Sequence, residues 1–182
     1  KAEIKIWQEF NEDWGTLSYE SEIILSKYKG RPIERIYGIS LDPLEFEGKE
    51  RDSVVRTRVN QIFFRNTVLA SYDFRCCITG ISIPELLIAS HIKPWSVDKN
   101  NRLNPQNGIC LNALHDKAFD KGLITITPDY CIRISKKLEQ HVDNYSSQQF
   151  FLPFFNKKIA QPQRFLPNKD FLEYHNEVIF LH

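Results

Sequence analysis

The chain has 182 residues, of which 42% are hydrophobic and 13% aromatic, so it can bury a core, and wholesale disorder is excluded. No apolar run approaches the roughly 18 residues that a membrane span needs, and no charged segment precedes an apolar one as in a secretory signal. We therefore expect a cytoplasmic protein with no membrane partner. The chain begins with lysine and contains no methionine, which indicates a fragment or a processed form whose N-terminal region lies outside it.

The balanced overall charge hides an asymmetry. Residues 51–137 carry 13 basic and 7 acidic side chains, a net charge of +6, whereas residues 1–50 carry 7 basic and 11 acidic ones, a net charge of −4. Residues 138–182 carry 4 basic and 5 acidic side chains, a net charge of −1. A basic centre is compatible with a phosphate backbone as partner, and it is equally compatible with ordinary variation of surface charge.

The first half of the chain predicts helices. Apolar spacing indicates one helix before Gly15, which breaks the pattern, and a second helix that ends near Gly30. Residues 31–50 lack periodicity and predict a linker, so residues 1–50 form a helical arm and linker. Residues 54–72 have the spacing of an amphipathic helix and belong to a second domain, residues 51–182.

The second half mixes short strands and helices. A strand is expected around residues 86–89, a helix over 112–121, a hairpin from 124–126 and 131–134, and a final helix after Pro167. The four cysteines include no C-x-x-C pair, so we expect small buried core residues in a reducing cytoplasm. The mixture predicts an α+β fold.

Three kinds of polar residue could carry chemistry. His91 follows an apolar strand, where an imidazole near its usual pKa of about 6.5 can deprotonate water or can be a satisfied structural histidine. Asp116 and Asp120 lie four residues apart, so on a helix they share one face. They could hold one divalent cation, or they could be solvated acids that pair with neighbouring lysines. Asn107 could form a turn or tie two backbone segments together.

The order of these residues resembles the HNH endonuclease family, the ββα-metal nucleases. The resemblance is closest to the bacterial restriction-endonuclease-like branch and rests on four blocks: Cys76-Cys77-Ile78-Thr79-Gly80, Leu86 to Pro94, Asn104 to Ile109 and Ala118 to Gly122. It covers residues 51–137 closely, and the flanking helices and the Pro167 to His175 segment more weakly. It implies an α+β fold with a ββα-metal core, a short β-hairpin and flanking helices.

The resemblance also implies roles for single residues. His91 would be the general base that activates water, and Asn107 would brace the hairpin against the helix. Asp116 and Asp120 would hold the metal. Ser90 stands where many family members have a stronger ligand, so water or phosphate oxygens would complete the coordination shell. For His115 a metal ligand, a second-shell group, a phosphate contact and a surface residue all stay open.

The implied function is a metal-dependent DNA endonuclease of a restriction or defence system. The alternative is a DNA-binding module on an HNH scaffold that has lost catalysis. The main support for this alternative is Ser90. Carboxylate ligands favour Mg²⁺ or Mn²⁺ as the divalent cofactor. A zinc domain is disfavoured because C-x-x-C pairs are absent, and a homodimer stays open. Basic side chains near the motif are expected to contact phosphates of double-stranded DNA: Lys93, Lys99, Arg102, Lys117 and Lys121.

Overall fold

The computed structural model describes residues 5, 9, 13–39, 48–141 and 145–182 of the chain. It divides into two compact units, residues 1–64 and residues 65–182. The domain boundary expected after residue 50 stays a prediction. None of the described helices combines the length and the apolar character that crossing a membrane would require.

The first unit is helical. Helix α2 (Trp14–Lys29) begins after Asp13, whose carboxylate accepts a hydrogen bond from the Thr16 backbone N–H at 3.0 Å, and it ends at Gly30 in the left-handed conformation. Short helix α3 (Ile33–Ile36) follows, and helix α4 (Gly48–Ser71) begins in this unit. A small core holds the unit together: Ile39, Val55 and Val59, with Tyr19, Ile33 and Tyr37 packed against them.

Two sequence expectations need correction here. The predicted break at Gly15 is wrong, because the Asp13 cap starts α2 at Trp14 and places Gly15 in the first turn. Residues 31–50 are not a pure linker, since they include α3 and the start of α4. The helix expected before Gly15 lies largely outside the described residues. The helix predicted over residues 54–72 is confirmed within α4.

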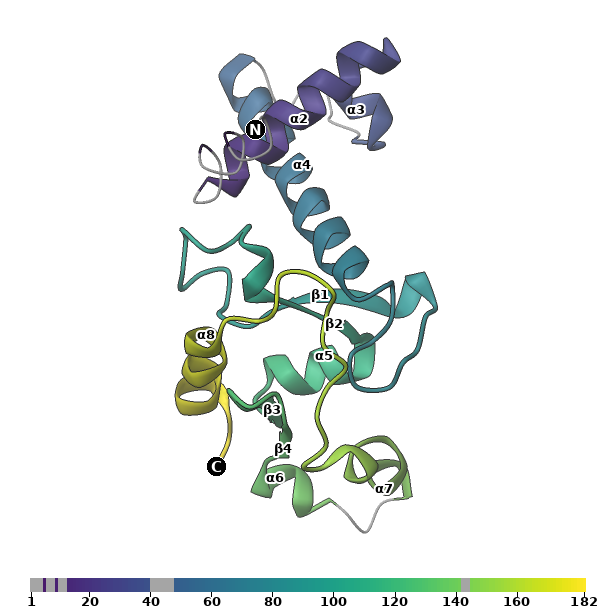
Figure 1. Ribbon diagram of the computed structural model, residues 1–182, viewed down its shortest axis with the longest axis vertical. Coiled ribbons are helices and arrows are strands. Elements are labelled where there is room, and N and C mark those ends of the chain that lie inside the picture. The colour runs from purple at the N-terminus through teal and green to yellow at the C-terminus, as the bar shows by residue number, and fades with distance from the viewer. Residues whose placement is uncertain (1–4, 6–8, 10–12, 40–47, 142–144) are drawn as a thin grey trace. The chain divides into compact units, whose positions relative to one another are not determined.

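The second unit is built on a ββα arrangement. Strands β1 (Leu87–His91) and β2 (Gly108–Asn112) pair antiparallel, with His91 opposite Gly108. Helix α5 (Ala113–Asp120) follows β2 directly and lies against both strands (Figure 1). The helix starts at this point because the Asn112 side chain caps its first turn. Short 3₁₀ turns η1 (Pro84–Leu86) and η2 (Pro105–Asn107) precede the two strands.

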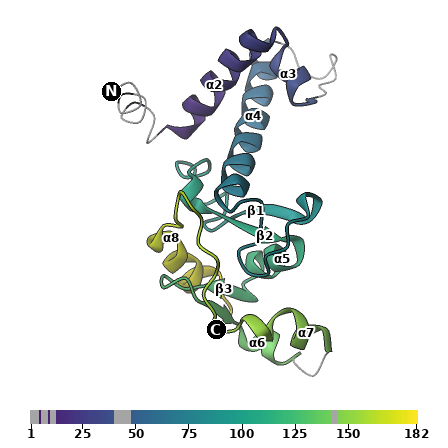
Figure 2. The ribbon, with the colours of Figure 1, turned by 45° about the vertical axis from the view of Figure 1, so that its right-hand side comes forward.

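The rest of the second unit covers this core. Strands β3 (Ile124–Ile126) and β4 (Ile132–Ile134) form the expected antiparallel hairpin. Helices α6 (Lys136–Glu139) and α7 (Tyr145–Phe150) and the turn η3 (Leu152–Phe154) follow, which the sequence did not predict. The expected final helix is α8 (Lys169–Tyr174), which continues into a π-helical turn, η4 (His175–Ile179), in contact with β3 (Figure 2).

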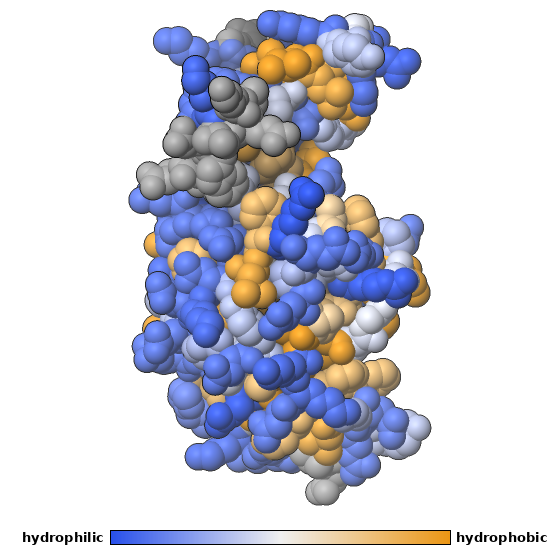
Figure 3. All heavy atoms as spheres, in the orientation of Figure 1, coloured by the Kyte–Doolittle hydropathy of each residue, from blue (hydrophilic) through white to orange (hydrophobic). Residues whose placement is uncertain are grey.

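Apolar side chains of the strands and of α5 meet in the core of this unit. Leu87, Ile109, Leu111 and Phe119 are at most 1% exposed. The expectation of core cysteines is confirmed for three free thiols, Cys76, Cys77 and Cys110, which are buried, while Cys131 is partly exposed. Burial raises the pKa of the Cys110 thiol to about 12, so it stays protonated and acts as a small apolar group. On the face seen in Figure 3, apolar side chains lie in small groups among hydrophilic ones.

Candidate active site

A cavity of about 460 Å³ is lined by the end of β1, one face of α5 and the π-helical turn η4. Its shape and lining come from three segments that are distant in the sequence. The structure brings six of the predicted site residues to this cavity: Ser90, His91, Asp116, Lys117, Asp120 and Lys121. The imidazole and the two carboxylates therefore line one hollow of the surface.

His91 is the last residue of β1, and its ring is oriented by a backbone carbonyl. Its Nε2 lies 2.8 Å from the carbonyl oxygen of Arg102. Because a carbonyl oxygen only accepts, Nε2 is the donor, and in the neutral ring Nδ1 carries the lone pair. Burial lowers the pKa of His91 from its usual 6.5, and the bond to Arg102 partly offsets this effect. The neutral ring that a general base needs is thus favoured at neutral pH.

The two carboxylates lie one helical turn apart on α5. Asp116 is partly buried and Asp120 is more exposed. Partial burial raises the pKa of both carboxyl groups, and the negative charge of Asp120 raises that of Asp116 further. The charges of Lys117 and Lys121 oppose the rise at Asp120. Two carboxylates that share a partly desolvated site repel each other, and a bound cation would relieve that repulsion.

Ser90 gives the site a third oxygen. Its hydroxyl lies near enough to Asp116 to oppose the rise in that pKa. The residue is only 2% exposed, and its Oγ makes no well-formed hydrogen bond to any residue that the structure describes. A buried hydroxyl with so weak a partner is poorly satisfied, and an ion or substrate oxygen in the cavity would satisfy it better. Two carboxylates and a hydroxyl are hard oxygen donors of the kind that suits Mg²⁺.

The side chains that the structure describes do not by themselves supply a complete coordination shell. Within residues 13–39, 48–141 and 145–182, no group of three or more His, Cys, Asp or Glu side chains is placed to hold a metal ion. Mg²⁺ commonly takes one or two carboxylates and keeps water or substrate phosphate as its other ligands. The donor set of Asp116, Asp120 and Ser90 fits that mode of binding.

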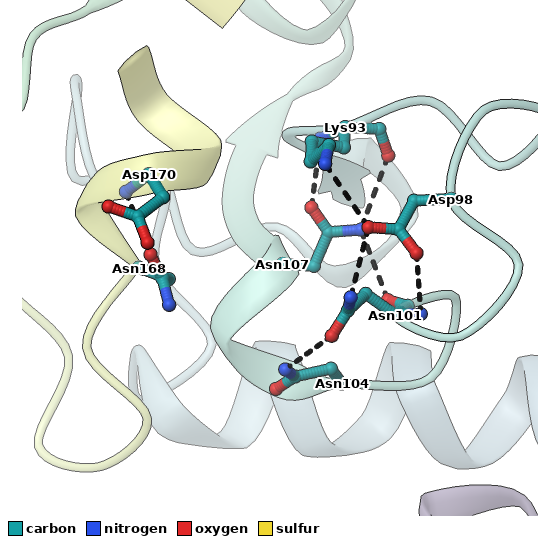
Figure 4. A network of polar contacts seen from close by, with 7 residues as sticks. All are labelled: Lys93, Asp98, Asn101, Asn104, Asn107, Asn168 and Asp170. Atoms are coloured by element: carbon teal, nitrogen blue, oxygen red, sulfur yellow. Dashed lines mark hydrogen bonds and ion pairs between the residues drawn. The ribbon is translucent and has the colours of Figure 1, made fainter. Parts of the chain in front are cut away.

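Asn107 ties together the loop that joins β1 to β2. Its Oδ1 accepts the Lys93 N–H at 2.8 Å, and its Nδ2 donates to the carbonyls of Lys93 at 3.2 Å and Asn101 at 3.1 Å (Figure 4). Asn107 is 1% exposed, so the amide braces the chain just after His91 and does not reach a substrate. Its described partners lie in this loop, whereas the sequence expectation was that it braces the hairpin against the helix.

His115 is not brought to the cavity. It is 2% exposed, with Nδ1 3.1 Å from the Asn112 Oδ1 and Nε2 3.0 Å from the Phe150 carbonyl oxygen. Its ring packs against Phe151 and Phe154. Burial and these contacts make His115 a structural residue, so the surface position left open for it is wrong, and a metal role has no support in its position.

The predicted DNA contacts fall into two groups. Lys117 and Lys121 line the cavity. Lys93 instead pairs with Asp98 at 3.2 Å and lies over the rings of α8. Arg102 donates from Nε to the Trp95 carbonyl at 2.7 Å and lies over the ring of that residue. Lys93 and Arg102 are thus engaged within the protein.

Two aromatic lining residues were missed from the sequence, Trp95 and His175. Trp95 directly follows the block that ends at Pro94, but nothing in that spacing shows that its ring meets His91 edge-on. His175 comes from the distant π-helical turn and is 1% exposed. Its ring stacks on Phe119 at a centroid distance of 3.6 Å, and its Nδ1 accepts from the Thr125 hydroxyl at 2.8 Å. Burial lowers the pKa of His175 to about 4, so it is a neutral wall of the cavity.

One of three comparisons with known proteins agrees with the motifs, a match to a family model. No curated protein matches the chain. A solved structure titled "Modification dependent TagI restriction endonuclease" matches with 20% sequence identity and a TM-score of 0.36, over 62% of this chain and 35% of that one. The chain thus spans about a third of that protein's length. Residues 76–127 match the family model described as HNH endonuclease, so the family recognised from the sequence blocks is confirmed over this segment.

Proposed function

We propose that the chain is a metal-dependent DNA endonuclease that hydrolyses phosphodiester bonds, in a restriction or other defence system. The observation that carries the proposal is the shared cavity of His91, Asp116 and Asp120. Family membership of residues 76–127 supports a nuclease broadly, and the family acts on DNA. Double-stranded DNA in the cytoplasm is the proposed substrate.

The proposed base is His91. A phosphodiester is negatively charged and repels hydroxide. The nucleophile is therefore a neutral water molecule, which must give up a proton to a base as it attacks phosphorus. Nδ1 of the neutral ring can accept that proton, because Nε2 is the atom that donates to the Arg102 carbonyl. General-base assistance of this type is typically worth about 10²–10⁴-fold in rate.

Asp116 and Asp120 would hold one divalent cation, Mg²⁺ or Mn²⁺, with Ser90 as a weaker oxygen neighbour. When bound, such an ion offsets the charge that builds on a phosphate in hydrolysis. Lys117 and Lys121 line the same cavity and would attract the DNA backbone, with an affinity that falls as salt rises. Phosphate contacts of this kind position DNA without reading its sequence.

The second candidate is a DNA-binding module without catalysis. The observation that favours it is Ser90, a weak ligand at a position next to the proposed base. The two candidates agree on DNA binding and differ in whether phosphodiester bonds break.

Plasmid cleavage separates the two candidates. Supercoiled DNA is incubated with the protein in Mg²⁺, Mn²⁺ or EDTA, beside His91→Ala and the control His141→Ala, which changes an exposed histidine outside the cavity. We expect metal-dependent cutting that His91→Ala abolishes while fluorescence anisotropy still reports DNA binding. Cutting that persists in His91→Ala would show that His91 is not the base. DNA binding by the wild type with no cutting in any of the metals would favour the DNA-binding module.

The same gels address the homodimer. A dimer that places two such sites on one duplex converts supercoiled plasmid directly to linear product, whereas a single site accumulates nicked circles first. Sedimentation at the cleavage concentration checks the oligomeric state independently.

A further inference from the structure

We infer that Arg102 and Trp95 are positioning residues that hold the His91 imidazole in the orientation a general base needs, and that Arg102 is not a DNA phosphate contact. This inference rests on the proposed nuclease function. It replaces the role that the basic character of Arg102 suggests from the sequence.

The three residues form a closed set of contacts. The Arg102 carbonyl accepts from His91 Nε2 at 2.8 Å, and the Arg102 Nε donates to the Trp95 carbonyl at 2.7 Å. The Arg102 guanidinium carbon lies 5.0 Å from the centroid of the Trp95 ring. That ring in turn meets the His91 ring edge-on, with centroids 5.5 Å apart and an interplanar angle of 87°. Each residue therefore touches the other two.

The edge-on contact adds what the hydrogen bond lacks. The Nε2 hydrogen bond by itself does not fix the rotation of the ring about its Cβ–Cγ bond, and such rotation would move Nδ1 away from an attacking water. The Trp95 ring lies beside the imidazole in an interplanar geometry that aromatic rings favour, and it blocks this rotation. Catalytic groups need to be held to within about 0.5 Å of the productive geometry, so a restraint on the rotation of the imidazole affects the rate of the reaction.

The carbonyl that binds His91 is itself anchored from both sides. On one side, the Asp98 carboxylate accepts from the Asn101 backbone N–H at 3.2 Å and from its Nδ2 at 2.9 Å, while Asn107 binds the Asn101 carbonyl (Figure 4). On the other side, the Arg102 side chain is tied to Trp95. These contacts fix the Asn101–Arg102 peptide and the Arg102 side chain, and so hold in place the residue whose carbonyl accepts from the imidazole.

A positioning arginine and a phosphate-binding arginine respond differently to substitution. Losing a phosphate contact weakens DNA binding and reduces the slope of log affinity against log salt by about 1. Losing a positioning residue leaves affinity and slope unchanged and lowers the rate of the chemical step, because a misplacement of about 1 Å can cost 10²-fold.

The test measures both properties in Arg102→Gln, Trp95→Ala and Trp95→Phe, with the exposed Arg164→Gln as the control. DNA affinity is measured in EDTA over a salt series, and single-turnover cleavage is measured at saturating plasmid. We expect wild-type affinity and slope throughout, with rates at least tenfold lower in Arg102→Gln and Trp95→Ala. Trp95→Phe keeps an aromatic edge and should recover most of the lost rate.

A second readout does not require cleavage. Nitrogen-15 NMR at one fixed pH reports which ring nitrogen carries the proton, and the His91 signals are those lost in His91→Ala. The wild type should show a single Nε2–H tautomer, and Trp95→Ala should show a mixture of the two tautomers. Thermal unfolding shows whether each variant folds. If Arg102→Gln does not fold, the comparison of Trp95→Phe with Trp95→Ala decides whether the aromatic edge holds the His91 ring.

Unchanged rates and an unchanged tautomer in Arg102→Gln and Trp95→Ala would overturn the inference and leave the nuclease proposal standing. A weaker affinity with a smaller salt slope in Arg102→Gln would also overturn it, by making Arg102 a phosphate contact. If the wild type cuts no DNA in any metal, the proposed function fails, and the NMR comparison still reports whether Trp95 holds the ring.

Discussion

The Asn112 side chain joins Thr79 to the first turn of α5. Its Nδ2 donates to the Thr79 hydroxyl at 3.1 Å, while its Oδ1 accepts the backbone N–H groups of Leu114 at 3.1 Å and His115 at 3.0 Å. Thr79 lies in a turn that is closed by a hydrogen bond, in which the Gly80 N–H donates to the Cys76 carbonyl at 2.8 Å. The turn therefore helps to set where the helix that carries both site carboxylates begins.

Substitution of this cap should destabilise the second unit. Asn112→Ala removes the cap and the bond to Thr79, so we expect the free energy of unfolding to fall by about 1–2 kcal/mol. Asn112→Asp keeps an oxygen at the cap and should cost less. Urea denaturation measures both, and equal losses in the two variants would show that the cap oxygen is not the stabilising group.

Cation binding should depend on both carboxylates of α5. We expect Asp116→Asn and Asp120→Asn each to weaken Mn²⁺ binding at least tenfold, because each removes a charged oxygen from a site that relies on few protein ligands. Asp129→Asn is the matched control, since Asp129 is exposed and does not line the cavity. Titration calorimetry measures the affinities, and wild-type binding in both variants would place the ion elsewhere.

Stability should fall on mild acidification because of His175. Its pKa in the folded chain is about 4, against 6.5 ordinarily, so below pH 6.5 the unfolded chain binds a proton that the folded chain refuses. The free energy of unfolding should therefore decrease from about pH 6.5 down to pH 4, by on the order of 3 kcal/mol from this residue. His91 and His115, whose pKa values burial also lowers, contribute with the same sign.

Denaturant unfolding between pH 7 and pH 5 checks this slope. His175→Gln should flatten it, whatever its effect at pH 7, and His141→Gln at an exposed site should leave it unchanged. A slope that His175→Gln does not alter would mean that the ring is not held neutral in the fold.

A side chain at Gly122 should not be tolerated. Gly122 has a φ of +64°, and a Cβ there would clash with the Ile179 carbonyl oxygen. Gly80 also has a positive φ, +75°, but a Cβ there would meet nothing within 4 Å. We expect Gly80→Ala to cost about 1–2 kcal/mol from backbone strain alone, and Gly122→Ala to cost more because the backbone of η4 must also move. Similar melting temperatures for the two variants would contradict the close approach.

Local patterns in the sequence predicted much of the fold. The 124–126 and 131–134 hairpin, the helix after Asn112 and the final helix after Pro167 all appear, because alternation, capping residues and turn residues act over a few positions. The predicted break at Gly15 is wrong for a local reason as well, because the capping residue Asp13 determines the start of α2 more strongly than Gly15 does. Helices α6 and α7 are short and carry no clear apolar period, although the capping residue Ser135 is a local signal for α6.

The candidate site was predicted less completely, because part of its wall comes from the distant turn η4. The spacing of Asp116 and Asp120 places both on one helix face, and His91 ends the strand beside them. A metal role stayed open for His115 because it adjoins Asp116, yet one residue along a helix turns the side chain by about 100°. Its ring meets Phe151 and the Phe150 carbonyl, which no local pattern reveals.

The docking of η4 on α5 has a consequence for biosynthesis. The His175 ring stacks on Phe119 of α5, and both His175 and Ile179 line the cavity. A polypeptide released early from the ribosome, with α5 complete and η4 missing, would carry the imidazole and both acids but lack this wall. Translation must therefore proceed through residue 179 before the hollow is enclosed.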